Sequence, residues 1–234
     1  MRPLGHTRFL RLARWALALL LLPPLLLLGS LEALYRCGLS RVGELPRTPR
    51  PRTDFASQVL WASVAPWPPQ VQPLWPWSLV GQRPGADVSW LVARPWLASR
   101  PPHERTPMLN WHFHGLALSV WVSRHWTAEE VMAGYAENAS FGGGLIGIDA
   151  AARWYFGEEP ARLALHEAAL LAALAQAPAR NDPLCRPEAA LARRDVVLSR
   201  LQALGWISEA QREEARRQPL LPPSSAAVRS SGCE

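Results

Sequence analysis

The chain has 234 residues, 49% hydrophobic and 19% charged, with a formal net charge of +6. It contains no lysine, so any mechanism that needs a lysine amine is excluded. The three cysteines, Cys37, Cys185 and Cys233, show no CxxC or metal-binding spacing. A disulfide between two of them is possible, but nothing in the sequence favours it.

An apolar segment without a charged residue runs from Trp15 to Leu31. A bilayer core needs about 20 apolar residues, with about 17 at the short end. The span reaches Tyr35 if Glu32 lies among the lipid headgroups. The sequence therefore predicts a cytoplasmic basic N-terminus over 1–14 and a transmembrane helix over 15–35, kinked at Pro23 and Pro24.

The alternative for this segment is a cleavable signal peptide, whose apolar region is normally about 7–15 residues long. The segment is longer than that, and its best cleavage site is mediocre, so an anchor is favoured. Arginines at positions 2–14 hold the N-terminus in the cytoplasm by the positive-inside rule. The rest of the chain is then expected on the periplasmic side of a bacterial inner membrane.

Arginine also follows the apolar segment, so the basic charge is concentrated on both sides of it. This arrangement is typical of contact with lipid headgroups. No zinc-finger spacing or aromatic-basic strand motif points to nucleic acid. We therefore expect the inner membrane as a partner and no nucleic acid.

Residues 36–54 are rich in proline and arginine and are expected to form a linker. Residues 55–65 form a short predicted helix. Proline recurs too often over 66–77 for a regular helix, and four tryptophans fall between Trp61 and Trp77. Two interpretations stay open for this segment, a packed Pro/Trp loop or a surface resting in the lipid interface, where tryptophan is favoured.

The rest of the chain predicts helices and little else. An apolar stretch interrupted by Pro95 covers 86–98, and a buried helix is expected over 106–123. Thr127 and Glu130 have the spacing of a capping box, which begins a helix that runs to Asn138. Further helices are expected over 146–156, 164–175, 187–204 and 208–217. These elements give a mostly α domain over 55–218, followed by a Pro/Ser-rich tail over 219–234 that is expected to be disordered.

Residues 141–217 resemble glycosyltransferase family 51, the peptidoglycan transglycosylase domain of class A penicillin-binding proteins and monofunctional transglycosylases. Several motifs carry the resemblance, in order and with natural spacing: Gly144–Ile148, Tyr155–Gly157, Leu165–Ala172, Gln176–Pro183 and Arg193–Leu201. The resemblance implies a lysozyme-like, all-helical domain behind a membrane anchor. It also implies lipid II or a glycan strand as ligand, and two glutamates that carry the polymerisation chemistry.

The first half of the domain departs from the family pattern. The Glu-Asp motif aligns with Ala65 and Pro66, and no glutamate lies between Glu44 and Glu104. Hydrophobic residues or glycine occupy the glutamine pair of the second motif and the Arg and Glu ends of the third, at Trp90, Leu91, Trp111 and Gly115. Losing one such polar group typically costs orders of magnitude in rate. We therefore predict a pseudoenzyme without a cofactor.

A few polar residues remain as candidates for a site. Glu137, at the asparagine of the fourth motif, is the best surviving acid and a weak catalytic candidate. Arg94 and Arg105 are candidates for contact with an anionic lipid or pyrophosphate. The other polar positions are interpreted as structural. His112 and His114 are a weak metal pair and are expected to have a surface or packing role. The acids Glu129, Glu130, Glu167 and Asp182 are expected to cap helices or pack.

Three functional hypotheses follow. The first is a membrane-anchored, transglycosylase-like subunit that acts by binding a cell-envelope protein complex or a lipid-linked glycan. The second is a divergent but active peptidoglycan glycosyltransferase that polymerises lipid II with a relocated acid such as Glu137. The third is a structural subunit of an envelope machine, such as a secretion or pilus assembly, with the Pro/Trp segment as its docking surface.

Overall fold

The computed structural model describes residues 5–65, 67–75, 88–100 and 108–221. Within these ranges it is helical, and its only β structure is the isolated bridge between Ser140 and Ile146. This confirms the predicted mostly α class. The helices are α1 (Gly5–Val42), α2 (Phe55–Ala62), α3 (Trp90–Ala98), α4 (Met108–His125), α5 (Ala128–Asn138), α6 (Ile148–Phe156), the 3₁₀ helix η3 (Pro160–Arg162), α7 (Leu165–Gln176), α8 (Pro187–Ala203) and α9 (Glu209–Arg217).

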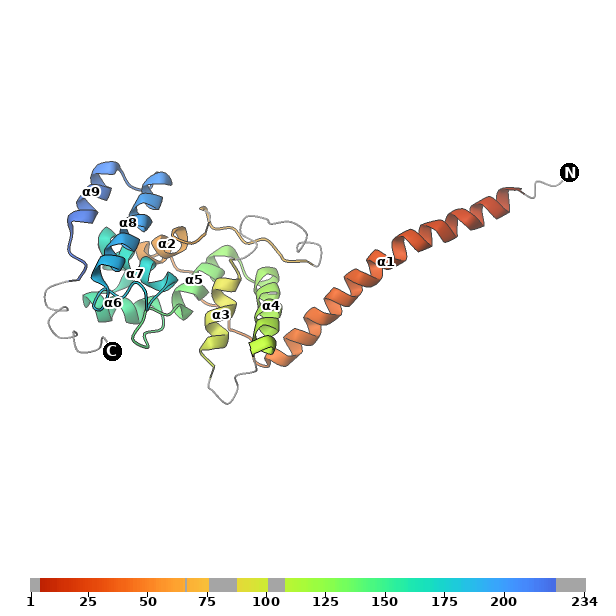
Figure 1. The fold of residues 1–234 in the computed structure, drawn as a ribbon, viewed down its shortest axis with the longest axis horizontal. Coiled ribbons are helices and arrows are strands. Elements are labelled where there is room, and N and C mark those ends of the chain that lie inside the picture. The colour runs from red at the N-terminus through yellow and green to blue at the C-terminus, as the bar shows by residue number, and fades with distance from the viewer. Residues whose placement is uncertain (1–4, 66, 76–87, 101–107, 222–234) are drawn as a thin grey trace.

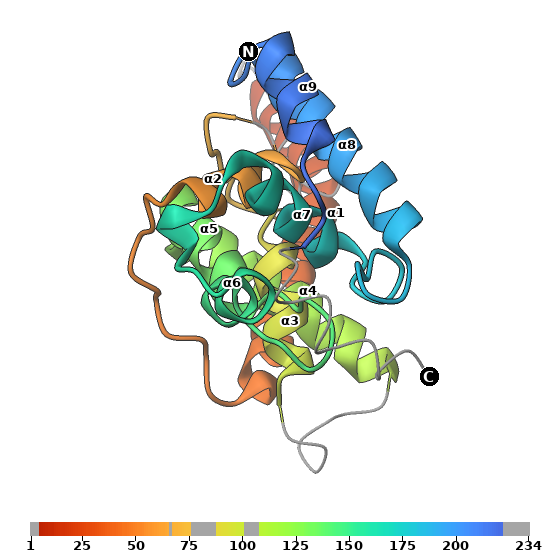
Figure 2. The ribbon, with the colours of Figure 1, turned by 90° about the vertical axis from the view of Figure 1, so that its left-hand side faces the viewer.

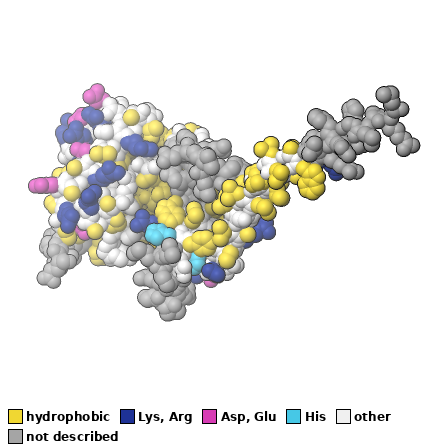
Figure 3. All heavy atoms as spheres, turned by 45° about the vertical axis from the view of Figure 1, so that its right-hand side comes forward, with side chains coloured by type: hydrophobic (Ala, Val, Ile, Leu, Met, Phe, Trp, Pro, Cys, Tyr) yellow, Lys and Arg dark blue, Asp and Glu magenta, His cyan; other side chains and the backbone are white. Residues whose placement is uncertain are grey.

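Helix α1 projects from the rest of the molecule as a long single helix (Figure 1). It continues through Pro23 and Pro24 and ends at Val42, so residues 36–42, predicted as linker, are helical. Residues 43–54 then run without helix to the start of α2. Hydrophobic side chains cover the projecting part of α1 (Figure 3), and the helix is long and apolar enough to cross a membrane.

The C-terminal part of α1 packs against α4. Gly38 permits this approach, because a Cβ there would lie 2.9 Å from both the Cβ of Ala117 and Cε1 of Phe113. One helix turn and a half earlier, Glu32 accepts a hydrogen bond from Nη1 of Arg124 at 3.2 Å. The acidic residue that the sequence places at the membrane boundary is therefore paired with the domain.

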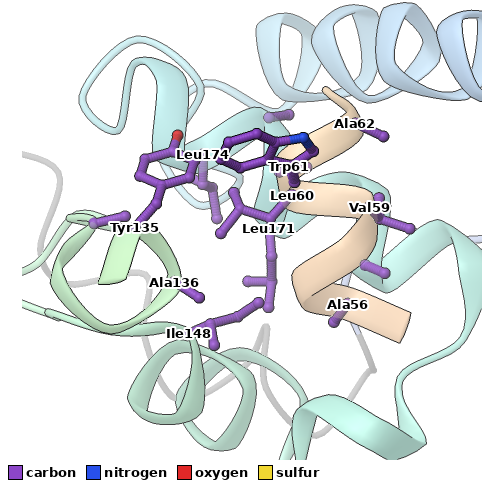
Figure 4. Close-up of a cluster of buried hydrophobic side chains, with 14 of the residues drawn as sticks. Ala56, Val59, Leu60, Trp61, Ala62, Tyr135, Ala136, Ile148, Leu171 and Leu174 are labelled. Atoms are coloured by element: carbon purple, nitrogen blue, oxygen red, sulfur yellow. The ribbon is translucent and has the colours of Figure 1, made fainter. Parts of the chain in front are cut away.

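Helix α7 lies at the centre of the domain and packs against α2, α6, α8 and α9 (Figure 2). All seven residues from Ala168 to Leu174 are buried, as expected of a helix that is apolar on every side. Trp61 on α2 is fully buried and packs with Leu171 and Leu174 in the cluster drawn in Figure 4. Helices α5 and α6 complete this core with Tyr135 and Ile148.

A buried arginine on α8 caps the C-terminal end of α9. Arg194 on α8 is 1% exposed. Its guanidinium donates to the backbone carbonyls of Arg216 at 2.8 Å and Gln218 at 2.9 Å, at the end of α9. These carbonyls have no partner inside the helix, so Arg194 caps α9 and fixes the point where the chain leaves it.

In the tryptophan-rich segment, one described tryptophan is packed, as expected of a loop, and another is partly exposed beside the membrane helix. Trp67 packs edge-to-face on Trp206, with ring centroids 4.5 Å apart, as in a packed loop. Trp75 is half-exposed beside the α1–α4 junction, where the guanidinium of Arg124 lies 4.3 Å from its ring centroid. Trp77 and residues 222–234 of the predicted tail lie outside the described residues.

Candidate functional site

Three of the predicted motif segments meet around one cavity of about 430 Å³, which we call the α3–α5 cavity. It is lined by residues from the end of α2, from α3, from α5 and from the end of α7, among them Val64, Trp90, Leu91, Arg94, Tyr135 and Gln176. The cavity therefore lies where the family resemblance implies a catalytic cleft. Among the described residues that line it, none is acidic.

The second and third motif positions are in direct contact. The indole of Trp90 covers Gly115 of α4, and a Cβ at position 115 would lie 2.8 Å from Cζ3 and Cη2 of that ring. Trp111, one turn before Gly115, meets Trp90 edge-to-face with centroids 6.2 Å apart. The space that a glutamate side chain at position 115 would need is thus filled by the indole.

Ala65, which aligns with the start of the first motif, is 1% exposed and belongs to the core, and its neighbour Val64 lines the cavity. Pro66 lies outside the described residues. Neither alanine nor valine carries an acidic group, so the described residues after α2 supply no carboxylate to the cavity.

The polar side chains among the described residues that line the cavity are those of Arg94, Tyr135, Ser140 and Gln176. Arg94 is exposed. Gln176 donates from Nε2 to Oγ of Ser63 at 3.0 Å and accepts a hydrogen bond from Arg193, which joins α7 to α2 and α8. Burial raises the pKa of Tyr135 well above its ordinary value, so its hydroxyl stays protonated. These groups can hold an anionic or hydrogen-bonding ligand, but they include no general base for neutral pH.

Arg200 occupies the C-terminal end of α2, beside the first motif. Its Nε donates to the carbonyl of Ala62 at 2.5 Å, and its Nη2 donates to that of Ala65 at 3.0 Å. A cation at a helix C-terminus is stabilising because it satisfies the free carbonyls and interacts with the helix dipole. This arginine fixes α2 against α8.

Glu137 faces a different cavity. Gly134, Glu137 and Asn138 share one side of α5 and line a cavity of about 350 Å³, which we call the linker cavity because residues 44–49 form its opposite wall. Tyr135 and Ala139, on another side of the same helix, line the α3–α5 cavity. Glu137 is therefore not among the residues that line the predicted cleft.

A cluster near Glu137 was not predicted. Arg52 donates to both carboxylate oxygens of Asp149, at 2.7 and 3.0 Å, and to Asp54 at 2.9 Å. Asp54 also caps α2 by accepting from the backbone N–H of Ser57 at 2.9 Å. The Arg52 guanidinium lowers the pKa of Asp149. Partial burial raises the pKa of Glu137, Arg52 opposes that change and Asp149 adds to it.

The acids read as structural occupy structural positions. Glu130 and Thr127 form the predicted capping box of α5, with hydrogen bonds of 2.7 and 3.3 Å. The Glu167 carboxylate accepts from the backbone N–H of Ala164 at 2.8 Å, and that of Asp182 accepts from Leu184 at 2.8 Å. Glu129 is exposed.

The two histidines differ in their surroundings. His112 is exposed, and His114 is buried. Burial lowers the pKa of His114, and Arg41 and Arg100 add to the effect. In the described part of the chain, no three His, Cys, Asp or Glu side chains gather as metal ligands would. Arg105, the second predicted anion contact, lies outside the described residues.

The cysteines also differ from one another. Cys185 is disulfide-bonded, and Cys37, near the end of α1, is a free and exposed cysteine. Nothing in the sequence indicates this bond, because the spacing of the three cysteines is uninformative.

Comparison with known proteins bears on the half of the domain that carries the resemblance. Residues 100–202 match the family model described as "Transgly: Transglycosylase". Residues 100–202 are therefore similar to the transglycosylase family. The chain is 43% identical to penicillin-binding protein 1A of Aquifex aeolicus over 103 residues and 39% identical to penicillin-binding protein 1C of Escherichia coli over 140 residues. These alignments cover 44% and 58% of this chain.

The chain spans only a small part of the length of these relatives. The chain covers 14% of the Aquifex protein and 17% of the Escherichia protein. The crystal structure of penicillin-binding protein 1A from Haemophilus influenzae is similar at 26% identity and a TM-score of 0.37, over 58% of this chain and 17% of that one. The family-model match begins at residue 100, after α2 and α3 and after the residues aligned with the first two motifs.

Proposed function

We propose that this protein is a membrane-anchored, transglycosylase-like subunit of the bacterial cell envelope that binds a lipid-linked glycan without polymerising it. The observation that carries the proposal is the contact between Trp90 and Gly115, which fills the space of a motif glutamate beside a cavity whose described lining residues include no acid. An attacking sugar hydroxyl has to lose its proton to a base, and no described residue lining the cavity can accept it.

The α3–α5 cavity still has features of a ligand site. Its volume of about 430 Å³ falls within the range of about 300–1,000 Å³ that is typical of such sites. Arg94 supplies a cation at the cavity for a pyrophosphate, Tyr135, Ser140 and Gln176 add groups that can form hydrogen bonds, and the other described lining residues are apolar. We therefore assign binding of the lipid-linked precursor to this cavity, with Arg94 as the anion contact.

The proposed location is the inner membrane, with α1 as anchor and the domain in the periplasm. Two observations support it. Arginines precede the apolar part of α1, which favours a cytoplasmic N-terminus. Cys185 forms a disulfide, and such bonds persist in the periplasm but are rare in the reducing cytoplasm.

The test is a lipid II polymerisation assay on the detergent-purified full-length chain, with an intact family member as positive control. We expect no glycan strands, together with saturable binding of a fluorescent lipid II that Arg94→Ala weakens. Glycan strands would overturn the non-catalytic assignment, and their loss in Glu137→Gln would identify a relocated base. Absence of lipid II binding would overturn the binding role.

A further inference from the structure

A narrow apolar groove lies where the long helix α1 meets the domain, apart from the two cavities described above. We call it the α1–α4 groove, and its volume is about 150 Å³. One wall is the last part of the apolar span of α1, a second wall is α4, and the segment Leu74–Trp75 completes it. All of its described lining residues except Glu32 and Arg124 are hydrophobic or aromatic.

Arg124 holds the walls of the α1–α4 groove together. Its guanidinium pairs with Glu32 of α1 at 3.2 Å and donates to the carbonyl of Leu74 at 2.8 Å. The same group lies 4.6 Å from the ring centroid of Tyr35 and 4.3 Å from that of Trp75. The walls are therefore fixed before a ligand arrives, and a preformed site loses little conformational entropy on binding.

The groove lies at the level where α1 leaves the bilayer, because Leu31–Tyr35 are both lining residues and the last residues of the apolar span. Around its rim, Leu34 is 54% exposed, Leu116 is 46% exposed and Trp75 is 42% exposed. Tryptophan is favoured at the membrane interface. Figure 3 shows hydrophobic side chains continuing from α1 onto the adjoining part of the domain. The groove thus extends the lipid-facing surface of α1 onto the domain.

The size and the rim of the groove favour a single lipid chain over a protein helix. A volume of about 150 Å³ is well below the range of about 300–1,000 Å³ for sites that enclose a whole small molecule, so the groove suits part of a flexible chain. Helices that associate in membranes meet at small residues, which let their backbones approach. The rim carries the large side chains of Leu34, Trp75 and Leu116 instead, and these keep a second helix away.

The polar end of the groove carries a surplus of positive charge. Glu32 is the one carboxylate among the described lining residues, and it pairs both with Arg124 and, at 3.3 Å, with Arg36 of the next turn. The side chain of Arg36 is 77% exposed, so it can contact a second anion. Two guanidiniums beside one carboxylate leave one positive charge, which matches the charge of one phosphodiester.

We propose that the α1–α4 groove binds one acidic glycerophospholipid of the surrounding membrane. One acyl chain lies between α1 and α4, and the phosphodiester accepts hydrogen bonds from Arg36 at the polar end. The site differs from the α3–α5 cavity, which lies among α2, α3, α5 and α7. The inference uses α1 as a membrane anchor, but it does not depend on binding of a lipid-linked glycan.

The test uses the full-length protein in phosphatidylcholine vesicles that contain phosphatidylglycerol with a photoreactive acyl chain. After irradiation, mass spectrometry of peptides locates the attached lipid. We expect adducts on residues 113–120 of α4 that saturate as the labelled lipid increases and that unlabelled phosphatidylglycerol suppresses. Adducts on residues 15–31 of α1, which any bilayer lipid contacts, should rise in proportion to the labelled lipid and serve as the internal reference.

Two variants probe the two ends of the bound lipid. Leu116→Asp should lower the α4 adducts relative to the α1 adducts by about tenfold or more, because a carboxylate is strongly disfavoured among hydrocarbon chains. Leu191→Asp is the matched control, since Leu191 is a partly exposed leucine of α8, and it should label like the wild type. Arg36→Gln should remove the preference for phosphatidylglycerol over a photoreactive phosphatidylcholine, whereas Arg217→Gln on α9 should keep it.

Several outcomes would overturn the proposal. Adducts on α4 that rise in proportion to the labelled lipid without saturating would indicate bulk bilayer contact. An absence of α4 adducts, or equal adducts in Leu116→Asp, would also contradict it, and stronger suppression by a polyprenyl phosphate than by phosphatidylglycerol would assign the groove to a carrier lipid. If Leu116→Asp fails to fold, Leu34→Asp on the opposite wall replaces it. None of these readouts involves a glycan, so the result is independent of the lipid II assay.

Discussion

The indole of Trp90 lies so close to Gly115 that a Cβ at position 115 would stand 2.8 Å from two of its ring atoms. The two positions belong to different motifs and different helices, and each explains the other: the glycine makes room for the indole, and the indole leaves no room for an acid. A single substitution toward the family pattern therefore meets a steric barrier.

This relationship predicts that Gly115→Glu destabilises the domain by about 1–3 kcal/mol, the usual cost of overpacking a core. In a Trp90→Ala background the same change should cost less, because the indole is gone. Urea denaturation in detergent measures the free energy of unfolding of the four proteins, and a coupling of about 0.5–3 kcal/mol is expected between neighbours. Additive effects would show that Trp90 does not block position 115.

The pairing of Arg52 with Asp149 predicts an acid-dependent loss of stability. The pKa of Asp149 is lowered in the folded state, so its contribution is fully present above the unfolded pKa of about 3.9 and is lost as pH falls through the lower folded value. Asp149→Asn should lower stability at pH 7 and flatten the pH dependence below about pH 4. Thermal unfolding between pH 2 and 7 checks this, and an unchanged profile would contradict it.

Arg194 is expected to be critical for the last helix. Arg194→Ala leaves the carbonyls of Arg216 and Gln218 without their donor, and a buried unsatisfied group costs about 1–3 kcal/mol. In Arg194→Ala, backbone amide hydrogen exchange should be faster than in the wild type. The increase should be larger in α9 than in α7, because the cap acts locally. Arg217→Ala serves as the control, since its ion pair with Glu214 at 2.6 Å is exposed and surface pairs contribute little.

Arg124 should hold α1 against α4. It pairs with Glu32 at 3.2 Å, donates to the carbonyl of Leu74 at 2.8 Å and lies between the rings of Tyr35 and Trp75, at 4.6 and 4.3 Å from their centroids. Arg124→Ala removes all of these contacts, so we expect α1 to move more freely relative to the domain.

Spin labels on the native Cys37 and on Leu116→Cys report this movement by pulsed electron resonance. Cys37 is free and exposed, and Leu116 is 46% exposed on α4. The distance distribution should broaden in Arg124→Ala and stay narrow in Arg36→Ala, whose side chain also pairs with Glu32 but is 77% exposed. Equal distributions in the wild type and Arg124→Ala would remove this role from Arg124.

Local interactions account for what could be predicted from the sequence. The capping boxes at Thr127 and Ser208 depend on residues three positions apart, and the apolar residues of α7 reveal its burial directly. The transglycosylase resemblance lies in this part of the chain, where helix after helix was placed within a few residues. The predicted helix ends at residue 35, seven residues before the end of α1, because the packing on α4 that holds residues 36–42 cannot be predicted from the local sequence.

Contacts between residues far apart in the sequence account for the features that could not be predicted. Arg52 and Asp149 are 97 positions apart, and nothing in either local sequence points to the other. The glycine at 115 was recognised as a lost acid, but its partner Trp90 becomes visible only when α3 and α4 are packed. The sequence does not distinguish the two sides of α5 either, so it does not show that Glu137 lines the linker cavity.

The continuity of α1 sets the distance between the end of its apolar span and the domain. Seven residues separate Tyr35, at the end of the apolar span, from the last helical residue, Val42. At 1.5 Å per residue this is a rigid rise of about 10 Å, and the junction at Gly38 and Arg124 leaves no hinge within it. With α1 in the bilayer, the domain is held low over the headgroups and samples a thin layer next to the membrane. Under the proposed function, the domain meets glycans close to the point where they are attached to lipid.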